Sequence, residues 1–291
     1  MSTLHTEALV LRGVDFGESD RIVHLLTPET GRLTAIAKGA RRSVKRFPGT
    51  LDFFNHLRIQ VERRRPTSMA RLELARLVRP FCGIRESPSR FALGCYLLEL
   101  LDRLAPEGGV RTDQAQLFRF ALGALQCIDQ RQPDLRLRTL LELRALDALG
   151  LRPELARCVS CGAQIGTPSR AQKGTAAAQG RVGFHIADGG PVCAACTQPG
   201  HPLLPVHVGT LRTLERSLSF ELDQLGRIAL GGSALEEART LLTRFLRFHV
   251  GLELRSERFL ADRLTLSEAK GTLRSPGTQP ARVSIVHGRR S

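Results

Sequence analysis

The chain has 291 residues, of which 42% are hydrophobic and 24% are charged, so it is long enough for two or three folded modules. This composition excludes disordered and collagen-like proteins, and no apolar run reaches the roughly 18 residues of a membrane span. Lys and Arg outnumber Asp and Glu by 43 to 28, and a formal net charge of +15 favours polyanionic partners such as nucleic acid.

Residues 1–6 lack the basic and apolar pattern of a secretion signal, and we therefore expect a cytoplasmic protein without a membrane partner. Residues 6–80 contain short apolar runs that are separated by turn signals. These runs predict strands at 8–11, 21–26, 32–37, 53–61 and 70–78. Five strands in so short a segment predict a small barrel of the OB type, a fold that binds single-stranded nucleic acid.

Basic residues concentrate between the third and fifth predicted strands, above all in the loop 38–47, which we expect to contact DNA phosphates. The predicted DNA-binding residues are Lys38, Arg41, Arg42, Lys45, Arg46, Arg58 and Arg63. An Arg-rich surface without a nucleic-acid partner is the alternative explanation of this charge. Base-stacking candidates are Phe16, Phe47, Phe53 and Phe54, of which we expect two to lie in the core. A nearby acidic group, Asp15, Glu18 and Asp20, is interpreted as a solvated turn.

Helical periodicity begins after residue 87 and predicts helices at 91–104, 117–128 and 134–149, the last one ended by Gly150. Two further helices are predicted at 211–218 and 233–250, with Gly251 at the end of the second, and we expect both to pack on the first three. Cys82, Cys95 and Cys127 stand in apolar segments, and we expect reduced thiols in the core at these positions.

The remaining cysteines, Cys158, Cys161, Cys193 and Cys196, form a C-x2-C-x31-C-x2-C pattern. Two such pairs can surround one Zn²⁺ with four thiolates, and a closed site of this kind stabilises folding without catalysing a reaction. A redox pair, a disulfide and a zinc deaminase fit less well, because the pairs come in tandem and residues 185–187 lack the deaminase glutamate. His185, His201 and His207 are expected at the surface, and a hairpin is expected around Phe184, Ile186 and Val192.

These elements predict an α+β multidomain protein with an OB-fold barrel at 1–80, an α-helical domain at 81–155 and 203–265, and an inserted zinc finger at 156–202. Residues 167–180 and the basic tail, 266–291, have compositions typical of unfolded segments, most clearly from residue 270 onward.

Several motifs together resemble the RecO family of bacterial DNA repair proteins. They are residues 6–11 (TEALVL), 17–21 (GESDR), 27–31 (TPETG), 37–42 (AKGARR), 96–102 (YLLELLD), 149–153 (LGLRP), the two cysteine pairs and 255–260 (RSERFL). The resemblance implies a non-enzymatic recombination mediator that binds single- and double-stranded DNA, anneals complementary strands and, with RecR, loads RecA onto DNA coated by single-strand-binding protein.

The resemblance also implies that RecF acts in the same pathway, that the helical domain captures the acidic C-terminal tail of single-strand-binding protein, and that the protein joins the nucleoid when DNA is damaged. The DNA-contacting residues of the family map to Lys38, Arg41, Arg42, Lys45 and Arg46, whereas Arg58 and Arg63 are added from their charge.

Two other classes of protein stay open from the residues alone. A sequence-specific zinc-ribbon transcription regulator would also combine basic charge with four cysteines. A zinc-dependent nuclease or hydrolase is less favoured, because the chain contains no H-E-x-x-H, no phosphate-binding G-x-x-x-x-G-K-[ST] and no cluster of carboxylates suited to Mg²⁺.

Overall fold

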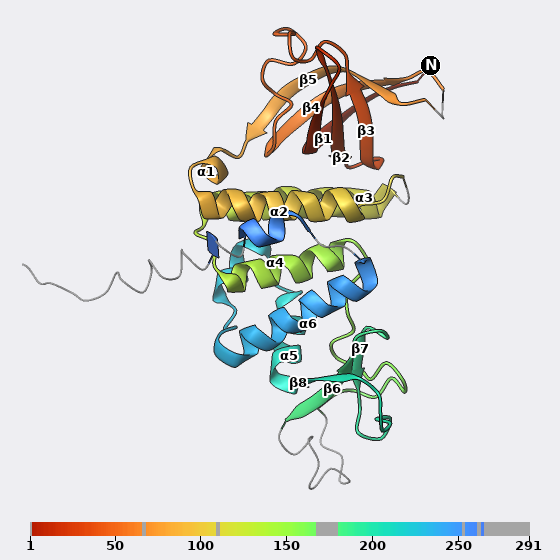
Figure 1. Cartoon of the computed structure of the whole chain (residues 1–291), viewed down its shortest axis with the longest axis vertical. Coiled ribbons are helices and arrows are strands. Elements are labelled where there is room, and N and C mark those ends of the chain that lie inside the picture. Colours follow the sequence, from red (N-terminus) through yellow and green to blue (C-terminus); the bar gives the residue numbers. More distant parts are fainter. Residues whose placement is uncertain are drawn as a thin grey trace, which may run out of the picture.

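The computed structural model describes residues 2–65, 68–108, 111–166, 180–251, 254–260 and 263–264. A barrel of N-terminal strands occupies one end of the molecule, helices are stacked beneath it, and a small sheet lies at the far end (Figure 1). The predicted unfolded stretches, 167–180 and 270–291, lie outside the described residues except for Gly180. Within the described part of the chain, no helix is long and apolar enough to span a bilayer.

Five strands form the closed barrel, and their neighbour order is β1-β2-β3-β5-β4. Their bounds are β1 (Ser2–Phe16), β2 (Asp20–Thr27), β3 (Gly31–Ala37), β4 (Asn55–Arg63) and β5 (Ala70–Pro80). β3 and β5 are parallel partners, whereas the other neighbouring strands pair in antiparallel fashion. This arrangement is the five-stranded OB-type closure, which confirms the predicted fold class.

Strand β1 is much longer than the predicted strand at 8–11, because it takes part in both walls of the barrel. Its first half pairs with β4 from Ser2 to Leu9, and its second half pairs with β2 from Leu9 to Phe16. The register shifts between Val10 and Arg12. A bulge at this point bends the strand and allows one chain segment to turn the corner of a small barrel.

Side chains that point into the barrel form a core separate from that of the helices. Its members alternate along the strands, as the period of a half-buried strand requires. They are Ala8, Val10, Val23, Leu25, Leu33, Ala35, Ala37, Leu57, Ile59, Val61, Ala70, Leu72 and Ala75, with Phe47 and Leu51 from the connection before β4.

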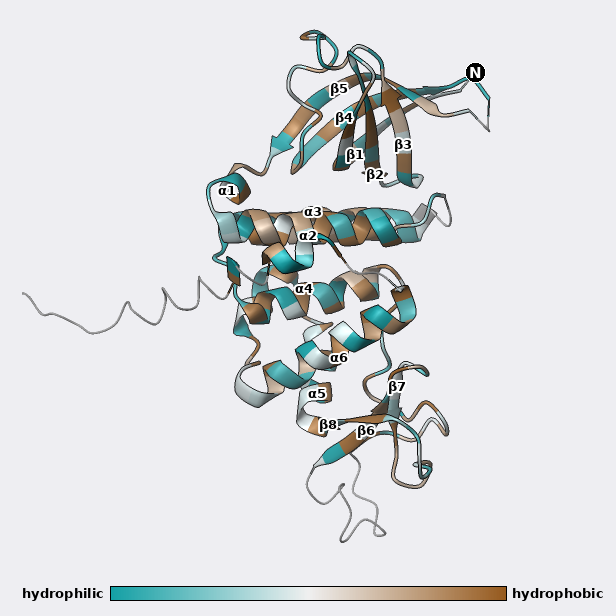
Figure 2. Cartoon of the chain, viewed as in Figure 1, coloured by the Kyte–Doolittle hydropathy of each residue, from teal (hydrophilic) through white to brown (hydrophobic). Residues whose placement is uncertain are grey.

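The predicted helices are confirmed with small changes of boundary. They are α2 (Pro88–Leu104), α3 (Arg111–Gln130), α4 (Leu135–Ala148), α5 (Val208–Ser217) and α6 (Gly232–Val250), with two short additions, α1 (Cys82–Arg85) and the 3-10 helix η2 (Leu222–Arg227). Hydrophobic and hydrophilic residues both occur along these helices, and the hydrophobic ones supply a shared core (Figure 2). Cys127 is buried and Cys95 is half-buried, but Cys82 is exposed, so the expectation of a core thiol at Cys82 was wrong.

Local capping explains where α4 begins and ends. The Asp134 carboxylate accepts the backbone N–H of Leu137 at 2.6 Å. At the other end, Gly150 adopts φ +71°, and the N–H of Leu151 reaches the carbonyl of Leu146 at 2.8 Å. This pairing is a Schellman motif, for which glycine has no steric cost.

Phe54 joins the barrel to the helices. It is fully buried, its φ is +62°, and its carbonyl accepts the N–H of Phe81 at 3.1 Å. The ring packs edge-on against Phe91 with centroids 5.4 Å apart, in space left by Gly94 of α2. Together with Leu9 and Leu11 of β1 it belongs to the helical core, so the two parts share buried surface.

Candidate nucleic-acid interface and metal centre

The four-cysteine pattern folds around a small sheet, β7-β6-β8, at the end of the molecule opposite the barrel (Figure 1). The predicted hairpin is β6 (Arg181–His185) with β7 (Gly190–Val192), and β8 (Leu203–His207) adds a third strand that the sequence pattern did not indicate. One cysteine pair precedes β6 and the other follows β7. The close approach of the two loops needs Gly190, since a Cβ there would lie 2.3 Å from Val159.

Each cysteine pair lies in a tight turn stabilised by backbone hydrogen bonds. In the first turn the N–H of Gly162, a residue with φ +73°, donates to the carbonyl of Cys158 at 2.8 Å. In the second turn the N–H of Cys196 donates to the carbonyl of Cys193 at 3.0 Å. These turns aim both sulfurs of a pair at the same point.

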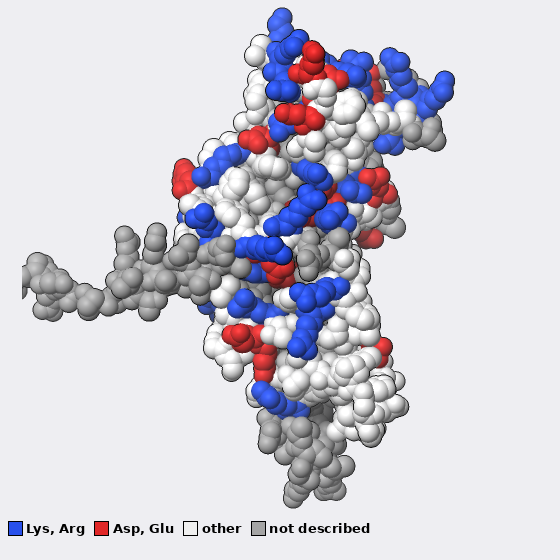
Figure 3. All heavy atoms as spheres, in the orientation of Figure 1, with Lys and Arg blue, Asp and Glu red and all other residues white. Residues whose placement is uncertain are grey.

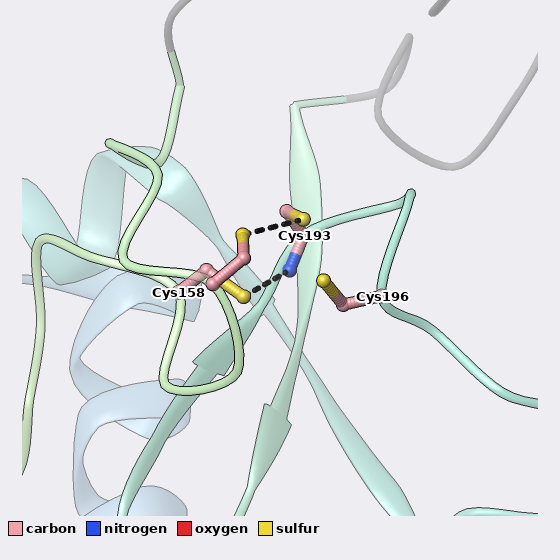
Figure 4. Close-up of side chains that lie close together, drawn as sticks. Cys158, Cys193 and Cys196 are labelled. Carbon is pink, nitrogen blue, oxygen red and sulfur yellow. Dashed lines mark hydrogen bonds between the residues drawn. The ribbon is translucent and has the colours of Figure 1, made fainter.

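The four sulfur atoms converge, and all of them lie within 4.8 Å of one another. Figure 4 shows Cys158, Cys193 and Cys196 directed toward one another, and the Sγ atoms of Cys161 and Cys193 are 3.7 Å apart. A tetrahedron with metal–sulfur bonds of about 2.3 Å has edges of about 3.8 Å, so the group can hold one metal ion with little movement.

The electrostatics of the group also fit a cation. Burial raises the pKa of Cys158, but backbone N–H groups led by that of Cys193, at 3.3 Å from the sulfur, lower it to about 6. In contrast, the neighbouring thiols of Cys161 and Cys193 raise the pKa of Cys196 to about 12. The cluster cannot ionise fully by itself, and a bound cation would compensate the four thiolate charges.

Among the described residues, the candidate metal group contains the four cysteines and none of the three nearby histidines. His185 lies 2.7 Å from a carboxylate oxygen of Asp188 and stacks on His201, with ring centroids 5.6 Å apart. His207 pairs with Glu237 at 2.5 Å. His201 is exposed as expected, whereas His185 and His207 are partly exposed.

At the barrel end, most of the predicted DNA-binding residues in the basic loop 38–47 are already engaged by carboxylates. Lys38 Nζ lies 2.9 Å from Asp20 Oδ2, Arg41 Nε lies 3.7 Å from Asp15 Oδ2, and Arg42 Nη2 lies 4.0 Å from Glu18 Oε2. The pairs that involve Asp15 and Glu18 are largely exposed, so each contributes little to stability. In the same loop, Arg46 pairs with Glu73 at 3.6 Å and Lys45 is exposed.

Asp15 and Glu18 are exposed beside the β1–β2 turn, as the solvated-turn interpretation predicted, whereas the Asp20 side chain at the start of β2 is largely covered. Asp20 has a positioning role, because it accepts the backbone N–H of Gly39 at 2.8 Å as well as the Lys38 ammonium. The Gly39 N–H and then Lys38 lower the pKa of Asp20. The carboxylates hold the basic loop beside the end of β1, in positions that phosphate groups could take over.

The outer surface of β1, β2 and β3 is a part of the candidate interface that the sequence reasoning missed. Cross-strand register places Val14 beside Ile22 and Ile22 beside Ile36 on this outer sheet face. Phe16, 52% exposed, and Val14, 41% exposed, extend the face toward the basic loop. Alternation of exposed residues along the end of β1 was the signal that could have identified it.

The four phenylalanines divide as expected, because Phe47 and Phe54 are buried in the two cores. Phe53 is partly buried against the helical core, which leaves Phe16 as the exposed stacking candidate of this set.

Arg58 and Arg63 lie on β4, outside the basic loop. Arg58 projects from the outer side of β4, opposite Glu7 of β1 and Arg76 of β5. Arg63 is paired with Ser2 at the end of β4. Both belong to the general basic surface, in which Lys and Arg are spread over the barrel and the helices (Figure 3).

Family models and related proteins of known name both match this chain. The N-terminal family model of recombination protein O matches residues 1–81, and the C-terminal model matches residues 85–258. The chain is 37% identical over 261 residues to a DNA repair protein RecO from Anaeromyxobacter dehalogenans, covering 89% of this chain and 96% of the relative. Relatives of the same name from Myxococcus xanthus (34%; 90% and 98% covered) and Syntrophus aciditrophicus (33%; 89% and 95% covered) are also similar.

The chain combines an OB-type barrel, a helical body and a four-cysteine module. Family models of a recombination protein match nearly its whole length, so this is a protein of DNA repair and recombination. The chain belongs to the RecO family.

Proposed function

We propose that this protein is a recombination mediator of the RecF pathway, which binds single- and double-stranded DNA and anneals complementary strands. The observation that supports it most directly is the basic loop 38–47 beside the exposed outer face of an OB-type barrel. Lys38, Arg41, Arg42, Lys45 and Arg46 contact phosphates in this proposal, and Arg58 and Arg63 add more distant contacts. Sequence preference is weak, because backbone charge dominates binding.

Annealing follows from charge neutralisation in this proposal. Two complementary strands repel each other through their phosphates, and a cationic surface that holds both reduces this repulsion. Such a role needs binding and release but no covalent chemistry, so the protein acts without being an enzyme.

The four-cysteine group holds one structural Zn²⁺ in this proposal. Four thiolates at tetrahedral spacing are a typical closed zinc site, and the ion would fix the two cysteine turns and the small sheet beside them. The proposed domain division follows the same architecture: a barrel at 1–80, a helical domain at 81–155 and 203–265, a zinc finger at 156–202 and a tail at 266–291.

The proposed partners are those of a mediator in the cytoplasm and on the damaged nucleoid. With RecR, the protein promotes loading of RecA onto DNA coated by single-strand-binding protein, whose acidic C-terminal tail binds the helical domain, and RecF acts in the same pathway. The basic surface of the chain is complementary to both DNA and an acidic tail.

The test is energy transfer between two complementary dye-labelled oligonucleotides, with and without single-strand-binding protein, across a salt series. We expect faster annealing that weakens steeply as salt rises, with both strands intact on a denaturing gel. Shortened strands would indicate a nuclease. Tight binding to one duplex sequence without annealing would indicate a transcription regulator.

A further inference from the structure

A cleft of about 380 Å³ lies where the end of the barrel meets the helices, and it is formed by β1, α2 and the C-terminal segment 254–260. Its apolar wall comes from Leu11, Phe53, Leu98 and Cys95. Burial raises the pKa of the Cys95 thiol to about 11, so this residue stays neutral at physiological pH. The volume lies in the range of pockets that hold small ligands.

Three arginines from three separate elements line the cleft: Arg12 of β1, Arg103 of α2 and Arg255 of the C-terminal segment. All three residues are exposed. None of their guanidinium groups makes an ion pair with another residue in the described part of the chain. They differ in this respect from Lys38, Arg41 and Arg42, whose charges are already matched by carboxylates.

The two acids of the cleft already have partners. Glu99 accepts the N–H of Arg255 at 3.0 Å, the N–H of Ser256 at 2.8 Å and the Ser256 hydroxyl at 2.6 Å. Asp102 is 2.6 Å from His24 Nδ1 and 3.9 Å from Arg32. Asp102 is directed at the barrel. Burial acts to raise the pKa of Glu99, but the hydrogen bonds from Ser256 and Arg255 and the charge of Arg103 lower it. Arg103 thus interacts with Glu99 through space but not in a direct ion pair, and an anion can bind the three arginines without breaking one.

The cleft continues the outer sheet face. Arg12 of β1 is the cross-strand partner of His24 of β2. Val14 and Phe16 follow Arg12 at intervals of two residues along β1, so all three lie on the same face of the strand. From Arg12 to Phe16 a strand extends about 13 Å, which is the length of about two nucleotides of an extended single strand. Phe16 in turn lies opposite Asp20, the carboxylate that holds Lys38.

We propose that the cleft binds one nucleotide of a single DNA strand that runs from the basic loop along the outer sheet face, with its base on the apolar wall and its flanking phosphates on Arg12, Arg103 and Arg255. This inference rests on the proposed DNA-binding function. Continuity with the sheet face favours nucleic acid over an acidic peptide, which would need only the cleft. The contact also makes the helical domain part of the DNA site and sets the direction in which the strand leaves the barrel.

The test compares Arg103→Ala combined with Arg255→Ala against wild type in binding of a dye-labelled oligo-dT across a salt series. Each phosphate contact with a single strand contributes about 0.7 to the slope of log K against log salt concentration. Loss of two contacts should therefore flatten this slope by about 1.4 and weaken binding about 25-fold at 0.1 M salt. The control, Arg227→Ala with Arg244→Ala, removes two exposed charges from η2 and α6 and should leave the slope unchanged. Arg103→Lys with Arg255→Lys should restore most of the affinity.

Photo-crosslinking of wild-type protein to oligonucleotides containing 5-iodo-deoxyuridine gives an independent readout. Mass spectrometry should locate crosslinks on Phe53 and on α2 near Cys95 and Leu98, in addition to Phe16. Crosslinks confined to the barrel would overturn the cleft proposal.

The outcomes separate this inference from the proposed function. If Arg41→Ala with Arg42→Ala flattens the slope and the Arg103–Arg255 variant behaves like its control, the cleft proposal falls and barrel binding stands. If neither variant changes the slope, both proposals fall. If the Arg103–Arg255 variant keeps its DNA affinity but loses binding of a labelled acidic peptide ending in an aromatic residue, the cleft is a peptide site and the nucleotide proposal is overturned.

Discussion

The acidic β1–β2 turn should weaken DNA binding by competing with phosphates for the basic loop. Replacing Asp15 by Asn and Glu18 by Gln removes the partners of Arg41 and Arg42, which lie 3.7 Å and 4.0 Å away. The side chains are exposed by 56% for Asp15 and 94% for Glu18, so each pair is worth only ~0.2–1 kcal/mol. DNA no longer has to break the two pairs, and affinity should rise about 2- to 30-fold.

Fluorescence anisotropy with a labelled oligo-dT at 0.1 M salt measures this change, and the gain should disappear near 1 M salt, where exposed charges are screened. The matched control is Glu221→Gln with Glu236→Gln, which removes two exposed acids, one just before η2 and one in α6. Asp20 is left unchanged because it also binds the Gly39 N–H. An affinity no higher than that of the control variant would refute competition between the acidic turn and DNA.

Three further predictions concern the scaffold. Gly94→Ala places a Cβ 2.7 Å from the Phe54 ring and should lower the free energy of unfolding, measured by chemical denaturation, by about 1–3 kcal/mol. Gly209→Ala, which has open space around it, should be neutral or stabilising. Equal denaturation midpoints for the two variants would contradict the packing argument. Burial raises the pKa of Glu142 to about 7 although Arg138 opposes the shift, so the folded state binds the proton more tightly and stability should fall by a few kcal/mol as pH rises from 5 to 8. Glu142→Gln should abolish most of that pH dependence of the melting temperature, and an unchanged profile would assign it to other groups. Cys196→Ser should remove the bound metal measured by elemental analysis and increase hydrogen exchange in β6 to β8 but not in the barrel, while Cys82→Ser, at an exposed position, should keep the metal; full metal content in the first variant would exclude Cys196 as a ligand.

Structural features that depend on residues close together in the sequence could be predicted from the sequence alone. Asp134 and Gly150 mark the two ends of α4 because capping involves residues within one helical turn. The cysteine spacing predicted a shared metal site because each pair can bend into a turn by itself, and the alternating runs of residues 6–80 predicted the strands of the barrel. Strand ends were less predictable, as β1 shows, because pairing with two different partners extends it in both directions.

Contacts between distant parts of the chain were decided only by the tertiary structure. Local sequence patterns did not indicate that Asp15 and Glu18 would face Arg41 and Arg42, because closure of the barrel brings these two parts of the sequence together. Phe54 looked like a stacking residue but became a buried contact between barrel and helices, because α2 leaves space for it at Gly94. The cleft of Arg12, Arg103 and Arg255 joins residues that the sequence separates widely. The sequence by itself determined the periodicity of the strands and helices, the helix caps and the metal-binding spacing, because each of these depends on neighbouring residues. The geometry of the proposed DNA-binding surface depends on how the barrel closes and docks on the helices, and packing and charge across the whole chain decide both.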